Sequence, residues 1–265
     1  MKAVLSLKDL GIRFGGLKAV WDLSLDVPEG SIFGLIGPNG AGKTTLFNLL
    51  TGVYVPTQGT IDLFGKSTLG VKTSKITARG LARTFQNIRL FKDMTVLENV
   101  IVALDNSEAM PKANPLSILL RSPKSIEIEA HKTAKAMEIL KIFNLDVKAQ
   151  EFAGSLPYGE QRRLEIARAL GTGARLVLLD EPAAGMNPNE TRDLMDTIRL
   201  IRDKLNVTVV LIEHDMKLVM SICERIAVLD YGVKIAEGSA KEIQSNPKVI
   251  EAYLGKAPET AETSA

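Results

Sequence analysis

The chain contains one cysteine, two histidines and almost no net charge, and these shortages exclude several classes of protein. Cys223 has no partner within the chain, so an internal disulfide is excluded and a reducing compartment fits. Its apolar neighbours predict a buried structural thiol, with a reactive thiol as the alternative. A net charge of +2 gives no electrostatic reason to expect nucleic acid as a partner.

Long apolar runs are missing as well. The longest, such as residues 207–212, have the length of a strand, whereas a helix that crosses a bilayer needs ~20 apolar residues. Residues 1–14 alternate charges with short apolar pieces, which is not the pattern of a signal peptide. We therefore expect a cytoplasmic chain that meets any membrane through its partners. A length of 265 residues with 45% hydrophobic residues indicates one large domain, or one domain with an inserted lobe.

What the chain does contain is a glycine-rich turn between an apolar strand and a helix. Residues 37–45 read G-P-N-G-A-G-K-T-T, with the apolar run 32–36 before them and residues 46–50 after them. This order predicts a loop that binds the phosphates of a nucleoside triphosphate. Glycines let the backbone N–H groups curl around an anion, and the N-terminus of the following helix points at the same place.

Two side chains of this loop have separate predicted roles. Lys43 would contact the β- and γ-phosphates, and the hydroxyl of Thr44 would ligate Mg²⁺. The alternative is a glycine-rich turn that holds a lysine by chance. The predicted nucleotide-binding residues are Gly37, Pro38, Asn39, Gly40, Ala41, Gly42, Lys43, Thr44 and Thr45.

Strand patterns lie on both sides of the loop. Residues 4–14 and 19–27 alternate apolar and polar side chains, which predicts an antiparallel β-layer beside the main sheet. Residues 60–65 predict a further short strand, and residues 82–86 predict another that ends in Gln86.

Helical periodicity dominates from about residue 87 to residue 155. One helix is predicted to open at residues 94–100 and a second to cover residues 126–143. Residues 105–125 contain three prolines and predict a long, mobile connection between them. His131 lies among charged residues, which favours a solvated or capping role over catalysis or metal binding.

The alternation of strands and helices returns after this region. Residues 176–179 and 207–212 are apolar runs of the buried-strand type, and Asn187 predicts the cap of a helix. Residues 226–236 predict a hairpin, and the small polar residues 256–265 predict a disordered tail.

Polar side chains follow the predicted parallel strands, and in a doubly wound sheet those strand ends share one edge. Asp180 ends an apolar strand, so its charge needs a partner, and Mg²⁺ held together with Thr44 is the natural one. Glu181 would polarise a water for attack on the γ-phosphate, and His214 would contact that phosphate. The alternatives are a surface carboxylate for Glu181 and a capping or core histidine for His214.

A second motif, L-P-Y-G-E-Q-R-R at residues 156–163, precedes a predicted helix over residues 164–170. With this motif the chain resembles the nucleotide-binding subunits of ATP-binding-cassette (ABC) transporters from about Leu5 to Leu254. The resemblance rests on the phosphate loop, a glutamine loop at Gln86, a signature motif at residues 156–160, the strand 176–181 and a switch histidine at His214.

The resemblance implies an α/β P-loop NTPase fold with a RecA-like core, an antiparallel β-subdomain and an inserted helical subdomain. Residues 1–86 and 156–255 would form the core and the β-subdomain, and residues 87–155 would form the helical part. It also implies an ATPase that uses ATP and Mg²⁺, with Glu181, His214 and Gln86 as catalytic residues. The metal would be held by Thr44, Gln86 and Asp180.

Family members act as head-to-tail dimers, so the resemblance implies a second ABC ATPase subunit, in a homodimer or a heterodimer. Each ATP would lie between the phosphate loop of one subunit and the signature motif of the other, here Leu156, Pro157, Tyr158, Gly159 and Glu160. Phe14 matches the position that stacks on adenine, with a core strand residue as the alternative. Residues 184–187 take the place of the dimer-contact loop.

The signature departs from the usual L-S-G-G-Q, because Pro157, Tyr158 and Glu160 replace serine, glycine and glutamine. A missing serine hydroxyl removes one expected donor to the γ-phosphate. Glu160 would be unfavourable beside a phosphate unless its side chain points aside, toward the ribose or the backbone.

The variant signature, residues 80–91 and residues 213–216 resemble those of branched-chain amino acid importers. Such a subunit would sit peripherally on the cytoplasmic face of the inner membrane, bound to transmembrane permease subunits and linked indirectly to an extracytoplasmic solute-binding protein. The alternatives closest to this group are importers of amides or urea and lipopolysaccharide exporters. The alternatives of another class are cassette ATPases of DNA repair or translation, and a regulatory cassette that binds ATP without hydrolysing it. The sequence does not name the solute.

Overall fold

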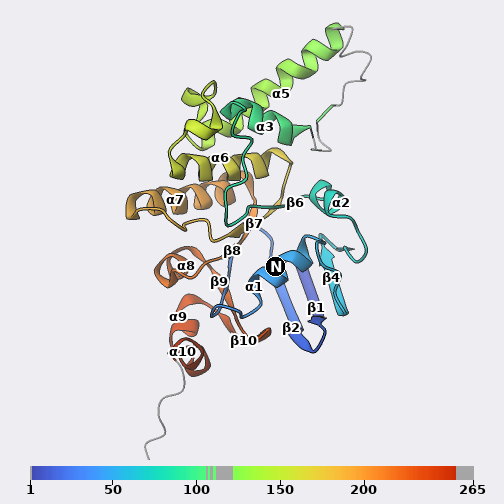
Figure 1. The fold of residues 1–265 in the computed structure, drawn as a ribbon, viewed down its shortest axis with the longest axis vertical. Helices are drawn as coiled ribbons and strands as arrows, with labels where there is room; N and C mark the ends of the chain where they lie inside the picture. Colours follow the sequence, from blue (N-terminus) through green and yellow to red (C-terminus); the bar gives the residue numbers. More distant parts are fainter. Residues whose placement is uncertain (1, 106, 108–109, 112–121, 255–265) are drawn as a thin grey trace, which may run out of the picture.

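The computed structural model describes residues 2–105, 107, 110–111 and 122–254. Two sheets and their covering helices form one part of the molecule, and further helices form the other end (Figure 1). The predicted disordered tail 256–265 and most of the predicted connection 105–125 lie outside the described residues.

The first sheet is antiparallel and confirms the predicted β-layer. Its strand order is β2 (Leu17–Pro28), β1 (Ala3–Phe14), β4 (Gln58–Leu63) and β5 (Lys66–Ser67). Alternate side chains of β1 and β2, such as Leu5, Leu7 and Leu23, are buried, as expected when one face of a sheet covers a core.

The second sheet carries the parallel strands. Five strands run parallel and β10 closes one edge in the antiparallel direction, which confirms the predicted hairpin. The order is β10 (Val233–Gly238), β9 (Arg225–Asp230), β3 (Ile32–Ile36), β8 (Thr208–Ile212), β7 (Leu176–Asp180) and β6 (Leu81–Arg83).

Strand β6 is shorter than the sequence predicts, because it ends at Arg83 and leaves Gln86 in a loop. Thr84 still donates its N–H to the Leu178 carbonyl at 2.9 Å. The next two carbonyls, of Phe85 and Gln86, accept bonds from the Arg162 side chain instead of a strand partner. A side chain from a distant helix therefore ends the strand.

The second sheet separates two hydrophobic cores. Along β7, Val177 and Leu179 face one core while Leu176 and Leu178 face the other. Burying each such side chain contributes about 1.5–3 kcal/mol relative to exposure. Helices α1 (Lys43–Leu50) and α2 (Thr73–Ala78) cover the side shared with the first sheet, and α7 (Pro188–Leu205), α8 (Met216–Ile222), α9 (Ala240–Gln244) and α10 (Pro247–Leu254) cover the other.

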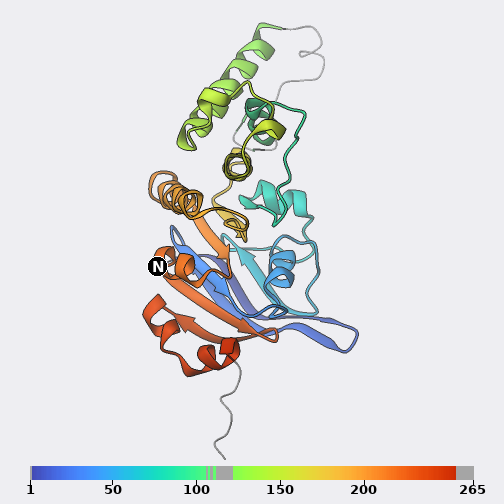
Figure 2. The same ribbon diagram turned by 60° about the vertical axis from the view of Figure 1, so that its left-hand side comes forward.

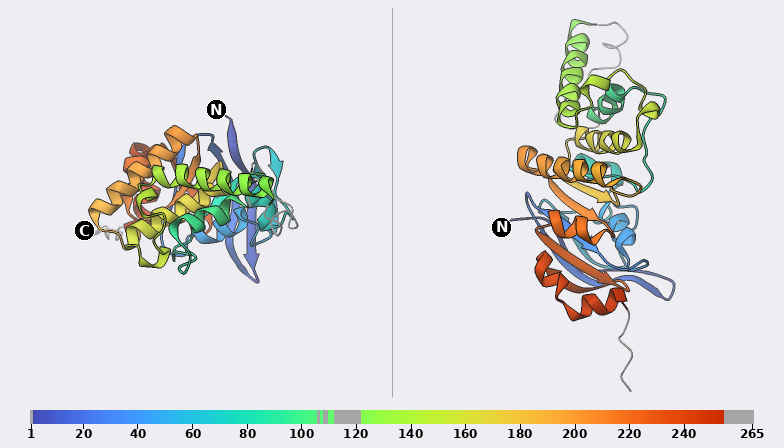
Figure 3. Two further views of the ribbon diagram at one scale, coloured as in Figure 1. Left: turned by 90° about the horizontal axis from the view of Figure 1, so that it is seen from above. Right: turned by 90° about the vertical axis from the view of Figure 1, so that its left-hand side faces the viewer.

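The remaining helices gather at one end of the molecule (Figures 2 and 3). They are α3 (Val96–Leu104), α5 (Pro123–Ile142), α6 (Tyr158–Gly171) and the short 3₁₀ helices η1 (Asp146–Lys148) and η2 (Ala153–Ser155). Thr95 caps α3 and exchanges bonds with Glu98, which fixes the start of this helix.

The predicted connection 105–125 is wrong at its end, because α5 already begins at Pro123. Ser122 caps it by accepting the N–H of Ser125, and proline fits the first helical turn, where no N–H partner is needed. His131 on this helix is exposed, in agreement with a solvated role. No helix of the described residues has the length and apolar character needed to cross a membrane.

Asn187 caps α7 as predicted, with its side chain accepting the N–H groups of Asn189 and Glu190. Cys223 is also buried as predicted, after α8, with a side chain that contacts one of the two cores. Burial raises the pKa of the Cys223 thiol to about 12, with the nearby Glu224 carboxylate acting in the same direction. The thiolate form is therefore suppressed in the folded chain.

We expect Cys223 to resist a disulfide exchange reagent at pH 8 in the folded chain and to react at once in urea. Because the thiol ionises at a lower pH when unfolded, the folded state should also lose stability as the pH rises above ~8.5. The rate is measured from the absorbance of the coloured thiolate that the reagent releases. The variant Ser74→Cys, at an exposed position of α2, provides a reactive control. Labelling of folded Cys223 as fast as that control would contradict a buried thiol.

Candidate nucleotide-binding site

The phosphate loop leaves β3 and enters α1 with a backbone that only glycine can follow at two points. Gly37 has a φ of 152°, and a Cβ on it would lie 2.1 Å from the carbonyl oxygen of Leu229. Gly42 has a φ of 100°, and its Cβ would lie 2.5 Å from the carbonyl oxygen of Ala19. The loop is therefore packed against two other strands, and the helix N-terminus at Lys43 opens toward it.

Lys43 folds back over this loop. Its Nζ donates to the carbonyl oxygens of Gly37 at 2.7 Å and Pro38 at 2.9 Å. Burial lowers the pKa of Lys43, and the carboxylates of Glu181 and Asp180 act in the opposite direction. A partly buried ammonium group held only by carbonyl oxygens is suited to exchange them for phosphate oxygens.

Three predicted site residues meet where the parallel strands end. Gln86 donates from Nε2 to Oε2 of Glu181 at 2.8 Å, and His214 Nδ1 lies 3.9 Å from the same oxygen. Glu181 has a φ of 46°, in the left-handed region, which costs of order 1–3 kcal/mol for such a residue. The Glu181 side chain in this conformation brings its Oε2 to both Gln86 and His214.

The predicted metal residues supply oxygen donors. Asp180 is buried at the end of β7, Thr44 is exposed on the first turn of α1, and the Gln86 amide leaves Oε1 available. Among the described residues no group of three or more His, Cys, Asp or Glu could hold a metal ion alone. One carboxylate with neutral oxygens fits Mg²⁺, which commonly completes its shell with water and substrate phosphates.

The signature motif lies in the first turn of α6, because the helix begins at Tyr158 and not at residue 164 as predicted. Pro157 stands at the cap position, where its missing N–H costs nothing. The ring of Tyr158 lies beside Gly185 of the predicted dimer-contact loop, and its hydroxyl accepts from Arg162 at 3.3 Å. Leu156 is buried in the core.

The Glu160 side chain points toward a lysine of a neighbouring segment. Both of its carboxylate oxygens accept from Nζ of Lys148, at 2.7 and 2.9 Å, and Arg163 lies 3.9 Å away. Lys148 belongs to η1, so a neighbouring segment neutralises the acid that replaces the usual glutamine. The motif can therefore contain a glutamate without presenting an unpaired negative charge.

Phe14 is not a core residue, in contrast to the alternative prediction. It ends β1 with 47% of its surface exposed, and its ring meets the Tyr54 ring edge to face at a centroid distance of 5.3 Å. Nearly half of this side chain is therefore open to solvent, where an aromatic ring can stack on a planar ligand.

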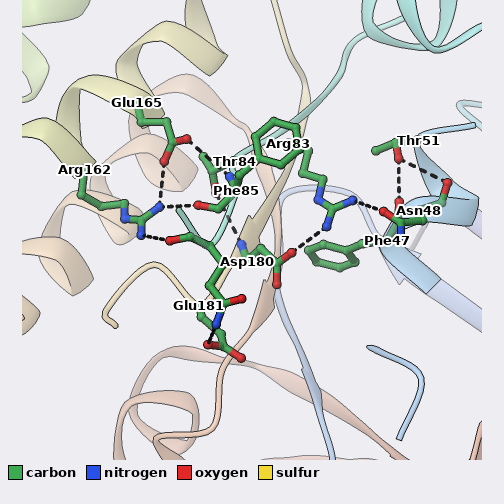
Figure 4. A network of polar contacts seen from close by, with 11 residues as sticks. Phe47, Asn48, Thr51, Arg83, Thr84, Phe85, Arg162, Glu165, Asp180 and Glu181 are labelled. Atoms are coloured by element: carbon green, nitrogen blue, oxygen red, sulfur yellow. Dashed lines mark hydrogen bonds and ion pairs between the residues drawn. The ribbon is translucent and has the colours of Figure 1, made fainter. Parts of the chain in front are cut away.

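A buried ion pair that the sequence analysis missed joins the glutamine loop to α6. Arg162 has no exposed surface and donates to the carbonyl oxygens of Phe85 at 2.6 Å and Gln86 at 2.7 Å, and to Glu165 at 2.7 Å (Figure 4). Glu165 in turn accepts the N–H groups of Phe85 and Arg89. The only signal of this pair in the sequence was the spacing of Arg162 and Glu165, three residues apart where a helix is predicted to begin. Opposite charges at that spacing usually form a pair on the helix surface.

Glu213 is a second missed residue. It lies between β8 and His214, is buried, and accepts the N–H of Ala183 at 2.8 Å. Burial raises its pKa, although hydrogen bonds from Ala183 and His214 oppose this shift. The hydrogen bond from Ala183 to Glu213 therefore connects the residues around His214 with the loop that follows Glu181.

The chain is similar in sequence and in structure to known proteins. The profile described as ABC transporter matches residues 20–184, and that described as branched-chain amino acid ATP-binding cassette transporter matches residues 233–259. The chain belongs to the ABC transporter family. It is an ATP-binding subunit of such a transporter and an ATPase, with the α/β cassette fold that the sequence predicts.

Two curated relatives of this family align over almost their whole length. The high-affinity branched-chain amino acid transport ATP-binding protein BraF of Pseudomonas aeruginosa is 48% identical, with 97% of this chain and 99% of BraF covered. LivG of Escherichia coli K12, which has the same description, is 46% identical, with 96% and 98% covered. A nucleotide-free ATP-binding cassette of an ABC transporter has a TM-score of 0.81 at 32% identity, over 96% of this chain and all of that one.

Proposed function

We propose that this ATPase energises an importer of branched-chain amino acids. The observation that carries the proposal is the 48% identity to BraF over 97% of this chain, which spans the phosphate loop, the unusual signature and the C-terminal helices. The separate match of the branched-chain amino acid cassette profile to residues 233–259 supports it at the C-terminal end.

The partner would be a permease docked in a cleft between the two parts of the molecule. A cleft of about 720 Å³ opens there, and its lining includes Asn48, Arg83, Phe85, Arg89, Phe91 and Arg168. Arg89 lies over the Phe85 ring at 4.0 Å and Arg168 over the Phe91 ring at 5.3 Å. Such a surface suits a short helix from a membrane subunit, which would keep the chain peripheral on the cytoplasmic face of the inner membrane.

The nucleotide would lie between two copies of the cassette, or between this chain and a related one. On this chain, Phe14 would stack on adenine while the loop 37–45 holds the phosphates. The partner's signature motif would offer its helix N-terminus and Gly159 to the γ-phosphate. The pairing of Glu160 with Lys148 supports this arrangement, because it removes a charge that would repel the phosphate.

The catalytic roles follow from the strand-end geometry. Glu181 would act as the base that orients and deprotonates the attacking water, held in place by Gln86. His214, whose Nδ1 lies near the same carboxylate oxygen, would contact the γ-phosphate. Asp180, Thr44 and Gln86 would hold Mg²⁺, which neutralises phosphate charge when bound.

Replacement of Glu181 by glutamine should abolish turnover but keep ATP binding. The amide can still accept the bond from Gln86, so the local geometry stays, while the base is lost and the rate should fall about 10²–10⁴-fold. Phosphate release measures the rate, and size-exclusion chromatography with ATP should show an accumulated dimer. Glu129→Gln on α5 is the control, and normal turnover by Glu181→Gln would refute the assigned base.

Removal of the Lys148 side chain should weaken ATP-driven dimerisation. The substitution Lys148→Ala removes both hydrogen bonds to the Glu160 carboxylate and leaves it only the longer contact with Arg163 at 3.9 Å. The repulsion between this carboxylate and the partner's γ-phosphate should then raise the dimer dissociation constant roughly tenfold. Analytical ultracentrifugation in the Glu181→Gln background measures this constant.

The double variant Lys148→Ala with Glu160→Gln should restore dimerisation, because the negative charge at position 160 is removed. Lys135→Ala breaks an exposed pair with Glu138 and serves as the matched control. An unchanged dimer in Lys148→Ala would show that Glu160 does not face the nucleotide across the interface.

The solute is tested with the complete transporter. In vesicles that contain the chain, its permease subunits and the solute-binding protein, leucine, isoleucine or valine should stimulate ATP hydrolysis severalfold. Urea and short amides serve as comparisons. Stimulation by those and not by the branched-chain amino acids would overturn the proposed solute while leaving the ATPase intact.

A further inference from the structure

Arg83 makes contacts that the catalytic roles above do not explain. It ends β6, and its Nη2 donates to Oδ2 of Asp180 at 2.7 Å while its Nη1 donates to Oδ1 of Asn48 at 2.7 Å (Figure 4). The Arg83 and Asp180 side chains are only 8% and 7% exposed. One guanidinium group therefore bridges the end of β7 and helix α1.

The bridge connects the two elements that carry the predicted metal donors. Asn48 lies one helical turn after Thr44 on α1, so both side chains point to the same side of that helix. Asp180 accepts the Arg83 hydrogen bond on Oδ2, so Arg83 leaves Oδ1 as a further oxygen donor. A change in this bridge would alter the distance and the angle between two donors of the site.

The arginine also lies against two aromatic rings. Its guanidinium carbon lies 5.4 Å from the centre of the Phe47 ring and 5.4 Å from that of the Phe85 ring. The fork geometry of arginine lets it bond two acceptors at once, which a lysine ammonium on a flexible stem does less well.

Stability alone does not account for this residue. The Nε of Arg83 is buried without a hydrogen-bond partner, and an unpaired buried donor is unfavourable. A buried ion pair gains little over apolar packing once the loss of hydration is counted. The orientation that it gives to Asp180 is the property that an apolar residue could not supply.

We infer that Arg83 is a positioning residue of the magnesium site, which fixes the Asp180 carboxylate and ties it to helix α1. The inference rests on the proposed assignment of Asp180 and Thr44 to that site. Hydrogen-bonded neighbours of metal ligands commonly change metal affinity about 10–100-fold when they are replaced.

The test measures metal binding apart from turnover. Purified full-length chain is loaded with a non-hydrolysable ATP analogue and titrated with Mn²⁺, observed by electron paramagnetic resonance. A second titration follows analogue binding in the presence of a chelator, without metal. The variants are Arg83→Lys and Asn48→Ala, and Arg175→Lys, which replaces an arginine stacked on Phe64 at 3.8 Å, is the matched control.

Arg83→Lys should weaken Mn²⁺ binding about tenfold and change metal-free binding of the analogue less than twofold. Asn48→Ala should weaken Mn²⁺ binding by a smaller factor, because Arg83 Nη2 can still donate to the Asp180 carboxylate. ATP hydrolysis by Arg83→Lys should recover when Mg²⁺ is raised, and Arg175→Lys should behave like the unchanged chain.

Two results would overturn the inference. Mn²⁺ affinity that is unchanged or tighter in a folded Arg83→Lys chain would show that the arginine does not position the ligand. If that variant fails to fold, as judged by circular dichroism, an unchanged Mn²⁺ affinity in Asn48→Ala would equally overturn it. Failure of the unchanged chain to bind the analogue at all would instead contradict the proposed nucleotide site.

Discussion

The parallel pairing of β3, β8, β7 and β6 is the constraint on which the site depends. These strands are buried on both faces, so nearly every side chain within them serves one of the two cores. The predicted binding and catalytic side chains therefore belong to residues that end or follow the strands. Parallel pairing brings the ends of the strands, and with them these residues, to one edge of the sheet. The phosphate loop, His214, Asp180 and Gln86 meet there for this reason.

Two charged groups at this edge and one in the signature motif have partners within the described part of the chain. Lys43 is held by two loop carbonyls, Asp180 by Arg83, and Glu160 by Lys148. An isolated buried charge would cost several kcal/mol, so such partners are needed for the chain to fold with an unfilled site. Of the three, only Lys43 would exchange its partners for phosphate oxygens on the proposed binding of ATP, while the two ion pairs would stay.

Helix α6 joins the nucleotide edge to the rest of the molecule. It carries the signature motif at its start, contacts α3 and α5 in the helical part, and holds the glutamine loop through Arg162 and Glu165. The same loop lines the cleft proposed for the permease. A displacement of that loop by a docked helix would therefore move Gln86 and the start of α6 together, because one buried ion pair links both.

The sequence by itself determined the phosphate loop, the helix cap at Asn187, the buried strands and the family, since each depends on residues close together in the chain. It misplaced the end of β6, the start of α5 and the start of α6. The Arg162 side chain binds the carbonyls that follow β6, and Pro123, counted with the connection 105–125, fits the first turn of α5. Only the tertiary structure decided that Glu160 pairs with Lys148, that Tyr158 lies beside Gly185 and that Arg83 holds Asp180. No spacing in the sequence marks these pairs, because folding alone brings their segments into contact.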